Sequence, residues 1–417
     1  MKLSLISPVL LAFVAATLSQ ASVIHVPTDQ PTIQAGIDAA VDGDTVIVDP
    51  GTYFENIIFY GKAITVSSAS GAAATIIDGS NFAPVAQFFT GETSSSVLKG
   101  FTLQHGVSMY SDGGGVFIWY CSPTIADNVI QENTACDGGG GIGVNFGSPL
   151  IKNNTILNNS QNDYCGGGIG GGGISVNGAG TAQIVGNTIS GNTWPTANGG
   201  GMAFNASGPV IVRDNVIAGN SVGGGIPASV GGGMYLANNS PALIVQNLIY
   251  DNAADEGGGI ALEIFGSTGG PTLLNNTIAN NSITQQGSAV YASGYDHPVQ
   301  MINNLLIGQP GQSAVFCDSV WSNEPPIISN SDAFSAGGTG LDGVCAGQST
   351  QNHNISVDPK FVNPFSNFRL KACSRAIDAG DNSAFLLPQR DFSGHPRIVD
   401  GDGDGTATID MGAYEAH

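Results

Sequence analysis

Five acidic side chains stand where a carboxylate could do chemistry, each close to a run of glycines. If they stack on successive turns of a repeating chain, neighbouring carboxylates lie about one strand spacing apart, near the roughly 5–5.5 Å between the carboxyl groups of a retaining glycosidase. The same oxygens also suit a cation. Solvated corners, cation sites and a catalytic pair are therefore three open interpretations of Asp112, Asp137, Asp163, Asp255 and Glu256.

The densest acidic run lies near the C-terminal end. Oxygen ligands at alternate positions, with Gly405 at the sixth place, match the first half of a calcium-binding loop, although Met411 replaces the acid at the twelfth. A calcium site and a solvated Asp-Gly turn both fit, and Asp410 can instead serve packing. The candidate Ca²⁺ ligands are Asp400, Asp402, Asp404, Thr406 and Asp410.

Aromatic side chains form a third candidate group. Tyr164 and Trp194 lie in segments whose length varies between repeats, and such insertions project from one face. Tyr110, Trp119 and Tyr120 lie near the first full repeat. Exposed rings offer a flat apolar face for sugars, so Tyr164 and Trp194 are candidate carbohydrate contacts, although packing inside the fold is the favoured interpretation.

Lys and Arg, which polyuronate lyases generally use to neutralise the substrate and abstract a proton, are scarce. From 112 to 310 the only ones are Lys152 and Arg213, at equivalent places two repeats apart, about 10 Å between backbones. They indicate a small basic patch or solubilising charges. His105 and His297 have no evident Ser or Cys partner, so we interpret both as structural.

These residues sit on an internal repeat. Six glycine triplets and a degenerate copy at Gly287 begin at intervals of 26 to 32 residues, and a motif N-x-[IL]-x-x-N follows each one, with the seventh motif degraded at Gln309. Two markers that keep step over seven copies indicate a solenoid, propeller or array. Asn tolerates left-handed backbone and its amide bonds to an Asn stacked above it, so we expect Asn128, Asn154 and Asn187 to form a vertical file.

The repeat type follows from what each unit can form. Its apolar residues are short β-branched pieces preceded by Pro, too short for helices. About 29 residues suit three strands and three turns, whereas a propeller blade needs roughly 40 or more. We therefore predict an all-β fold, a single-stranded right-handed parallel β-helix, with regular repeats over 101–315.

Residues 22–100 are expected to form an N-terminal cap and the first coils. After Pro31 and Thr32, a short helix with Ile33, Ile37 and Ala40 on one face would cover the open first coil. The segments 26–27, 31–40, 43–48, 50–53 and 61–66 resemble the opening of pectin-esterase-like and related parallel β-helix proteins. The resemblance implies the pectate-lyase and pectin-esterase type of fold and no particular reaction.

Residues 316–417 are expected to hold the terminal coils and a separate module. The segments 358–362, 368–370, 376–380, 391–397 and 409–415 resemble the choice-of-anchor Q module of secreted bacterial β-helix proteins. In that group the module often precedes an anchoring signal. Since the sequence stops at His417, we expect free secretion or non-covalent retention at the surface.

The first 21 residues have the pattern of a secretory signal peptide. Lys2 is followed by an apolar stretch, and Ser19 and Ala21 provide small residues at a cleavage site. No later stretch of 18 apolar residues occurs. In an oxidising compartment the six cysteines favour disulfides, and we expect the pairs Cys136–Cys165 and Cys317–Cys345.

Composition excludes several classes of partner. Eleven Lys and Arg stand against 32 Asp and Glu, a formal charge of −21, which disfavours nucleic acids and anionic membranes. The sequence therefore predicts an extracellular surface or matrix protein that binds carbohydrate or a partner without catalysis. The alternative is a polysaccharide-degrading lyase, esterase or hydrolase.

Overall fold

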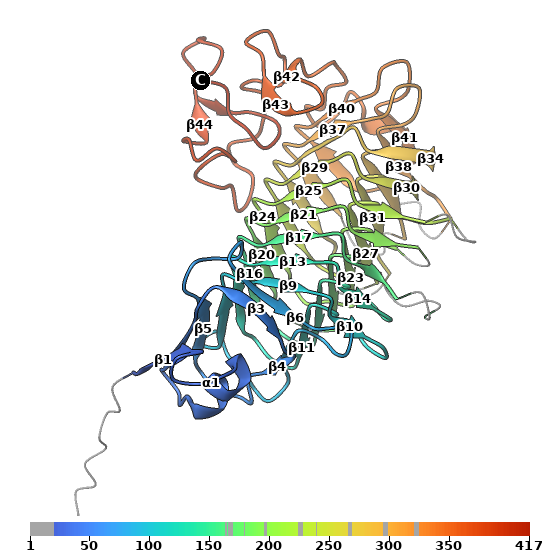
Figure 1. Ribbon diagram of the computed structural model, residues 1–417. Coiled ribbons are helices and arrows are strands. Elements are labelled where there is room, and N and C mark those ends of the chain that lie inside the picture. Colours follow the sequence, from blue (N-terminus) through green and yellow to red (C-terminus); the bar gives the residue numbers. More distant parts are fainter. Residues whose placement is uncertain are drawn as a thin grey trace, which may run out of the picture.

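The chain winds into a right-handed parallel β-helix, as predicted. The computed structural model describes residues 21–162, 165, 170–178, 180–195, 198–223, 228–238, 240–265, 269–294, 299–320 and 325–417. Successive coils stack along one axis, with the N-terminal helix at one end and the C-terminal segment at the other (Figure 1). No helix in these residues is long and apolar enough to span a membrane.

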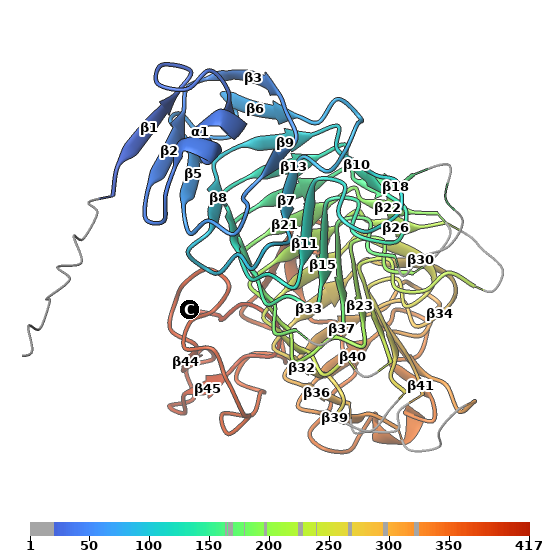
Figure 2. The same cartoon turned by 90° about the horizontal axis from the view of Figure 1, so that it is seen from below.

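Three parallel sheets form the long walls of the β-helix (Figures 1 and 2). Sheet A contains β1 (Val23–Val26), β2 (Thr45–Val48), β5 (Thr65–Ser68), β8 (Val97–Lys99), β12 (Thr124–Ala126), β16 (Leu150–Lys152), β20 (Gln183–Val185), β24 (Ile211–Arg213), β28 (Leu243–Val245), β32 (Thr272–Leu274), β36 (Gln300–Ile302) and β39 (Ile327–Ser329). Sheet B contains β3 (Gly51–Phe54), β6 (Thr75–Asp78), β9 (Thr102–Gln104), β13 (Val129–Gln131), β17 (Thr155–Leu157), β21 (Thr188–Ser190), β25 (Val216–Ala218), β29 (Leu248–Tyr250), β33 (Thr277–Ala279), β37 (Leu305–Ile307) and β40 (Asp332–Phe334). Sheet C contains β4 (Ile57–Ile58), β7 (Ala86–Phe88), β11 (Val116–Trp119), β15 (Ile142–Asn145), β19 (Ile174–Asn177), β23 (Met202–Asn205), β27 (Met234–Ala237), β31 (Ile260–Glu263), β35 (Val290–Ser293), β38 (Val315–Cys317) and β41 (Leu341–Gly343).

A fourth, shorter sheet D corrects the expectation of three strands per coil. Its strands mostly have two residues and lie between the second Asn of each repeat and the next glycine triplet. They pair from coil to coil like the others, because every strand that stacks on its neighbour satisfies backbone groups. The strands are β10 (Val107–Ser108), β14 (Thr134–Ala135), β18 (Ser160–Gln161), β22 (Thr193–Trp194), β26 (Ser221–Val222), β30 (Ala253–Glu256) and β34 (Ser282–Gln286).

The core is a column of aliphatic side chains. Ile125 lies beside Ile151 in sheet A, and Ile130 lies beside Ile156 in sheet B. All four are fully buried. Because alternate residues of a strand point to opposite faces, the short β-branched pieces of each repeat fill the interior while their neighbours face outward.

Two ladders of buried asparagines run along this column. Asn128 Nδ2 donates to Asn154 Oδ1 (3.2 Å), and Asn154 Nδ2 donates to Asn187 Oδ1 (3.0 Å). A parallel ladder passes through Asn133 and Asn159. The predicted vertical file is confirmed, and it satisfies amide groups that would otherwise be buried without partners.

The glycine triplets allow neighbouring coils to approach closely. At Gly113, φ is +75°, in the region that favours glycine. A Cβ atom on Gly115 would lie 2.6 Å from the carbonyl oxygen of Gly141 on the next coil. The triplets are therefore a steric requirement of the stacking.

The predicted N-terminal cap is present as helix α1 (Ile33–Ala39). Thr32 Oγ1 accepts a hydrogen bond from the backbone N–H of Ala35, an N-cap contact. Ile33 and Ile37 are fully buried against the first coils. The helix covers apolar side chains that the first coil would otherwise leave in water.

The C-terminal segment returns along the outside of the β-helix after the last coils. A 3-10 helix η1 (Ala346–Gln348) follows β41, and two antiparallel pairs come next. Phe368 and Met411 pack with Leu305 of sheet B, and the backbone N–H of Ala413 donates to Thr277 Oγ1 (3.0 Å). The pairs are β42 (Phe361–Asn363) with β43 (Asn367–Leu370) and β44 (Ile398–Val399) with β45 (Thr408–Ile409).

Both predicted disulfides are confirmed. Cys136 pairs with Cys165 and Cys317 with Cys345. Of the other two cysteines, Cys121 is buried and Cys373 is exposed, and both are free thiols. Each bridge joins adjacent coils and stabilises the stack.

Candidate functional site

The outer face of sheet C carries a group of aromatic side chains. Val116 of β11 is fully buried, so the alternate residues Phe117 and Trp119 point outward. The register of β11 with β15 places Phe117 beside Gly143 and Trp119 beside Asn145. The aromatic side chains thus lie next to small and amide side chains on the following coil.

Four aromatic rings form a continuous surface, which we call the aromatic platform: Phe117, Trp119, Tyr120 and Phe146. The rings of Tyr120 and Phe146 stack, with centroids 4.8 Å apart and planes 9° apart. Trp119 meets these two rings edge-on at 5.5 and 5.9 Å. Tyr120 is 62% exposed. The four rings thus form one contiguous, partly exposed apolar patch.

Two platform residues hold an unfavourable backbone conformation. Tyr120 and Phe146 have φ of +52° and +56°, rare for bulky residues and costing on the order of 1–3 kcal/mol each. The equivalent place on the next coil holds Gly178, over which the Phe146 ring lies: a Cβ there would be 2.4 Å from Phe146 Cδ1. Phe146 was not among the residues predicted from the sequence, although it follows its glycine triplet by the same interval as Tyr120.

A groove of about 350 Å³ borders the platform. Phe117 belongs to both, and Phe82, Met109 and Tyr110 also line the groove. Phe82 and Tyr110 are among the most exposed aromatic residues, at 82% and 91%. The groove extends the apolar surface toward the N-terminal coils.

Asp112, one of the predicted carboxylates, lies buried beside this surface. Asn177 Nδ2 donates to Asp112 Oδ2 (3.0 Å). Burial raises the pKa of Asp112 to about 6, the nearby charge of Asp137 adds to the increase, and Asn145 and Asn177 oppose it. Asp137 itself is exposed. The two carboxylates interact, but one is solvated and the other is enclosed.

The predicted acidic residues Asp255 and Glu256 lie far from Asp112. Five coils separate β11 from β31, which is about 24 Å of stacked strands. Asp255 accepts hydrogen bonds from Ser229 and Thr284, and the Thr284 bond is the largest cause of its lowered pKa. The predicted carboxylates therefore do not form a single site. Asp163 lies outside the described residues, as do Tyr164 and His297.

Glu256, the last residue of β30 in sheet D, belongs to a second group that otherwise lies along sheet C and was not predicted from the sequence. We call it the acid–tyrosine cluster: Tyr235, Glu256, Glu263, Tyr291 and Asp318. Tyr235 Oη donates to Glu263 Oε2 (2.6 Å), and Tyr291 Oη donates to Asp318 Oδ2 (3.1 Å). Its members come from four strands and one turn, so only the register between coils brings them together.

The carboxylates of this cluster influence one another. Burial raises the pKa of Glu256, a hydrogen bond from Gln286 opposes the increase, and the charges of Asp318 and Glu263 add to it. Burial also raises the pKa values of Tyr235 and Tyr291. A carboxyl group with a raised pKa beside two other carboxyl groups is an arrangement that can supply a general acid.

The structure overturns the candidate role of Trp194 as an exposed sugar contact. Its side chain is fully buried, packed with Val222 and Ala254. Trp194 belongs to β22 of sheet D, where the coil-to-coil pairing encloses it. The favoured interpretation, packing inside the fold, holds for this residue.

The predicted calcium loop divides into an exposed turn and a buried acid. Carboxylate oxygens of Asp400, Asp402 and Asp378 lie within 4.8 Å of one another. Asp410 is buried elsewhere and accepts backbone N–H groups of Asp378 (2.8 Å) and Ala416 (2.7 Å). Asp378 therefore replaces Asp410 in the candidate ligand group, because hydrogen bonding within the C-terminal segment occupies both Asp410 oxygens.

The exposed part of that loop is built from short turns. Thr406 and Asp404 are exposed, and the backbone N–H of Thr406 donates to Asp404 Oδ1 (2.7 Å). Asp400 similarly accepts from Gly403 and Gly405. These bonds are those of a solvated Asp-Gly turn, and calcium binding stays a prediction.

The basic residues lie on a different wall. Lys152 and Arg213 both flank Val185 in sheet A, so they are two coils apart as predicted. His105 bridges two carboxylates: Nδ1 lies 2.8 Å from Asp78 Oδ2 and Nε2 lies 3.3 Å from Glu132 Oε2. These contacts join three coils and fit the predicted structural role.

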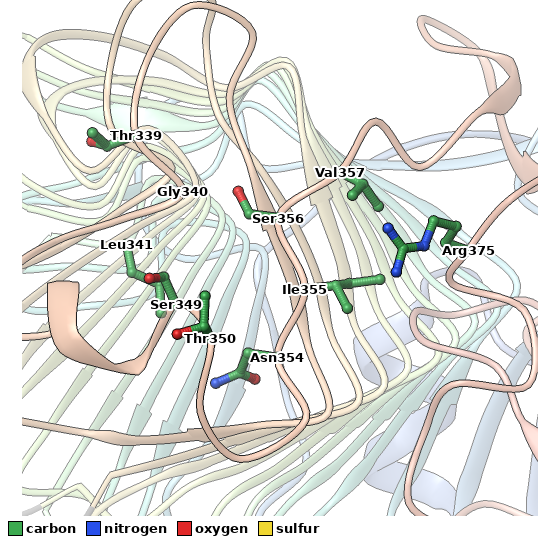
Figure 3. A pocket seen from close by; sticks show the side chains of 10 residues that line it. All are labelled: Thr339, Gly340, Leu341, Ser349, Thr350, Asn354, Ile355, Ser356, Val357 and Arg375. Carbon is green, nitrogen blue, oxygen red and sulfur yellow. The ribbon is translucent and has the colours of Figure 1, made fainter.

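A depression of about 510 Å³ lies at the C-terminal end of the β-helix. Figure 3 shows the guanidinium of Arg375 on one side and the hydroxyls of Ser349 and Thr350 on the other. None of the site residues predicted from the sequence lines it. The coils that form this depression are many coils away from those that carry the aromatic platform.

Comparisons with known proteins agree with this architecture. The family model described as "Right handed beta helix region" matches residues 36–229 and 167–333. The chain is similar to the pectate lyase Pel9A (TM-score 0.57, 16% identity, 96% of this chain and 97% of that one). It is also similar to XylC in complex with xylose (TM-score 0.57, 12% identity, 95% and 99%). At these identities the likeness shows the fold alone. No curated protein matches the chain.

Proposed function

The chain belongs to the right-handed β-helix family, and from this premise we propose that it binds a neutral glycan on the outer face of sheet C without catalysing a reaction on it. The observation that carries the proposal is the backbone of Tyr120 and Phe146. Both hold exposed aromatic rings in left-handed conformations, at a place that the coil after Phe146 fills with Gly178. Residues that cost stability and contact solvent are explained best by binding.

The chemistry of the platform matches a sugar better than a protein helix or an anionic polymer. Stacked, partly exposed rings present flat apolar faces, as sugar rings require. No Lys or Arg lies at the outward positions of sheet C in the described residues, and the formal charge is −21. A polyuronate would be repelled, so a neutral polysaccharide is the proposed ligand class.

Export is part of the same proposal. Its supports are the signal-like residues 1–21 and the resemblance of the C-terminal segment to a module of secreted proteins. The two disulfides favour an oxidising compartment as well. Fractionation of cells that express the full chain tests it: we expect the protein outside the cytoplasm, lacking residues 1–21.

The binding test compares two exposed aromatic residues on different faces. Trp119→Ala removes the edge-on ring of the platform, whereas Phe54→Ala removes a ring that is 72% exposed at the end of β3. On an array of xylan, glucan, mannan and pectin we expect wild type and Phe54→Ala to bind the same neutral glycan. Trp119→Ala should lose at least tenfold in affinity. Equal binding by both variants would contradict the proposal.

Glycoside hydrolysis is a second candidate function, favoured by the acid–tyrosine cluster. There Glu256 has a raised pKa and stands near two other carboxylates, the acid and base roles that hydrolysis requires. Reducing-end release from the bound glycan tests it. If wild type releases sugar and Glu256→Gln does not, the protein is a hydrolase; if wild type retains the glycan intact, binding alone stands.

A further inference from the structure

Four polar atoms without hydrogen-bond partners gather beside the aromatic platform. By hydrogen-bond geometry they are Asp112 Oδ1, Asn145 Nδ2, Ser175 Oγ and Asn177 Oδ1, four of the eleven such atoms on the described side chains, although the Asn145 amide lies near enough to Asp112 to lower its pKa. Each of these four side chains is more than nine-tenths buried. Buried polar groups are almost always satisfied, and a group of them without partners indicates an ion or water at that place.

The register of two strands brings the four side chains together. Ser175 and Asn177 are alternate outward residues of β19, and Asn145 lies directly beside Asn177 in β15. Asp112 approaches from the preceding coil and accepts a hydrogen bond from Asn177. A Cβ atom on Gly138 would lie 2.9 Å from both Asp112 Oδ1 and Ser175 Cβ. Gly138 therefore leaves room where these groups meet.

The charge of Asp112 also lacks compensation. Asp137 is the charged group that influences its carboxyl, and it has the same sign. Glu92, equally buried, accepts hydrogen bonds from Gly61, Thr90 and Cys121. A buried carboxylate is ordinarily paired with a cation or coordinates a metal ion. None of the described residues supplies a cationic partner to Asp112.

We propose that Asp112, Ser175 and Asn177 bind a hard cation, with Ca²⁺ as the best fit. Three of the unpartnered atoms are oxygens, and Asn145 supplies a fourth when its amide is rotated by 180°. Carboxylate, amide and hydroxyl oxygens suit Ca²⁺, whose flexible coordination tolerates irregular ligand sets that Mg²⁺ does not. Water would complete the shell.

The bound cation would hold the turn before β11 against β15 and β19. That turn carries Met109 and Tyr110, which line the groove beside the platform. Cation binding would therefore order the groove for its ligand. This consequence rests on the proposed glycan binding, whereas the cation site itself does not.

The experiment is a Ca²⁺ titration of the full chain after EDTA treatment, by calorimetry and by thermal unfolding, without glycan. The acidic loop near residue 400 is a separate candidate, so Asp402→Asn serves as the matched control for Asp112→Asn. We expect wild type and Asp402→Asn to share a binding event that raises Tm. Asp112→Asn and Ser175→Ala should weaken it at least tenfold.

Each outcome decides the assignment. The Asp112→Asn substitution replaces the carboxyl group by an amide of the same shape. A cooperative melt of the cation-free variant verifies that this variant folds. Loss of the event in Asp402→Asn and its retention in Asp112→Asn would assign the cation to the C-terminal loop and overturn the proposal. An equal response to Mg²⁺ or to NaCl at matched ionic strength would also overturn it, as a general salt effect.

Discussion

The two ends of sheet C use aromatic residues in opposite ways. At the N-terminal end the rings of the platform are exposed, and Tyr120 and Phe146 hold backbone conformations that cost stability. At the other end Tyr235 and Tyr291 are buried and donate to carboxylates. The exposed rings of the platform are free to contact the proposed ligand, whereas the tyrosines of the cluster are buried and also support the fold.

The largest expected effect is on the pH dependence of stability, and it comes from Asp112, which lies buried beside the platform. Folding raises the pKa of this carboxyl from 3.8 to about 6 through burial. The protonated form is therefore favoured in the folded state, and stability is lost as the pH rises from about 4 through 6. The loss amounts to about 3 kcal/mol in cation-free protein.

Denaturant unfolding of cation-free wild type and Asp112→Asn between pH 4 and 7 measures this difference. The free energy of unfolding of wild type should fall relative to that of the variant, and Ca²⁺ should remove the fall. If the free energies of unfolding of the two proteins change with pH in parallel, the buried carboxylate of Asp112 does not destabilise the folded protein.

A smaller effect is expected at the other end of sheet C. Tyr235→Phe keeps the buried ring and removes the hydrogen bond to the carboxylate of Glu263. The free energy of unfolding should fall by about 1–2 kcal/mol, with glycan binding unchanged. Trp119→Phe is the comparison variant. If Tyr235→Phe weakens glycan binding more than Trp119→Phe does, the binding surface extends to the cluster.

A still smaller effect tests the acid role in the cluster. Burial raises the pKa of Glu256, so its ionised form is disfavoured in the folded state, and stability declines as the pH rises through that pKa. Because the side chain is only half-buried, Glu256→Gln should raise the free energy of unfolding by less than about 1 kcal/mol at pH 7. Unfolding at pH 4 and pH 7 measures it, and destabilisation at pH 7 would contradict the assignment.

Much of the fold was predictable because its determinants repeat. Glycine and asparagine recur in step, so the stacking of Asn128 on Asn154 follows from the period alone. The strands of sheet D were not predictable in this way, since two residues are too few for a hydrophobic pattern. Because sheet D was not predicted, the place of Trp194 within it was not predicted either.

The candidate site was predictable only in part, for a related reason. Tyr120 stands out as an aromatic residue, and Phe146 could have been found at the equivalent place of the next repeat. Glu263 and Asp318 could not, because their nearness to Glu256 depends on which outward positions neighbouring coils align. The period of the sequence determines which residues stack on one another from coil to coil. A site on the surface depends in addition on how the outward positions of neighbouring strands align.

The central claim, that the platform binds a glycan at the expense of stability, is tested most directly by the double variant Tyr120→Gly and Phe146→Gly. Glycine adopts the left-handed conformation freely, so the free energy of unfolding should not fall and should rise wherever the relieved backbone cost exceeds the lost ring contacts. Asn158→Gly makes the same backbone change on the far wall, where φ is +54°.

Affinity for the glycan identified on the array, measured by calorimetry, is the deciding quantity. We predict a loss of at least tenfold in the double variant without a decrease in Tm, with wild-type affinity in Asn158→Gly. Wild-type affinity in the double variant would contradict the account.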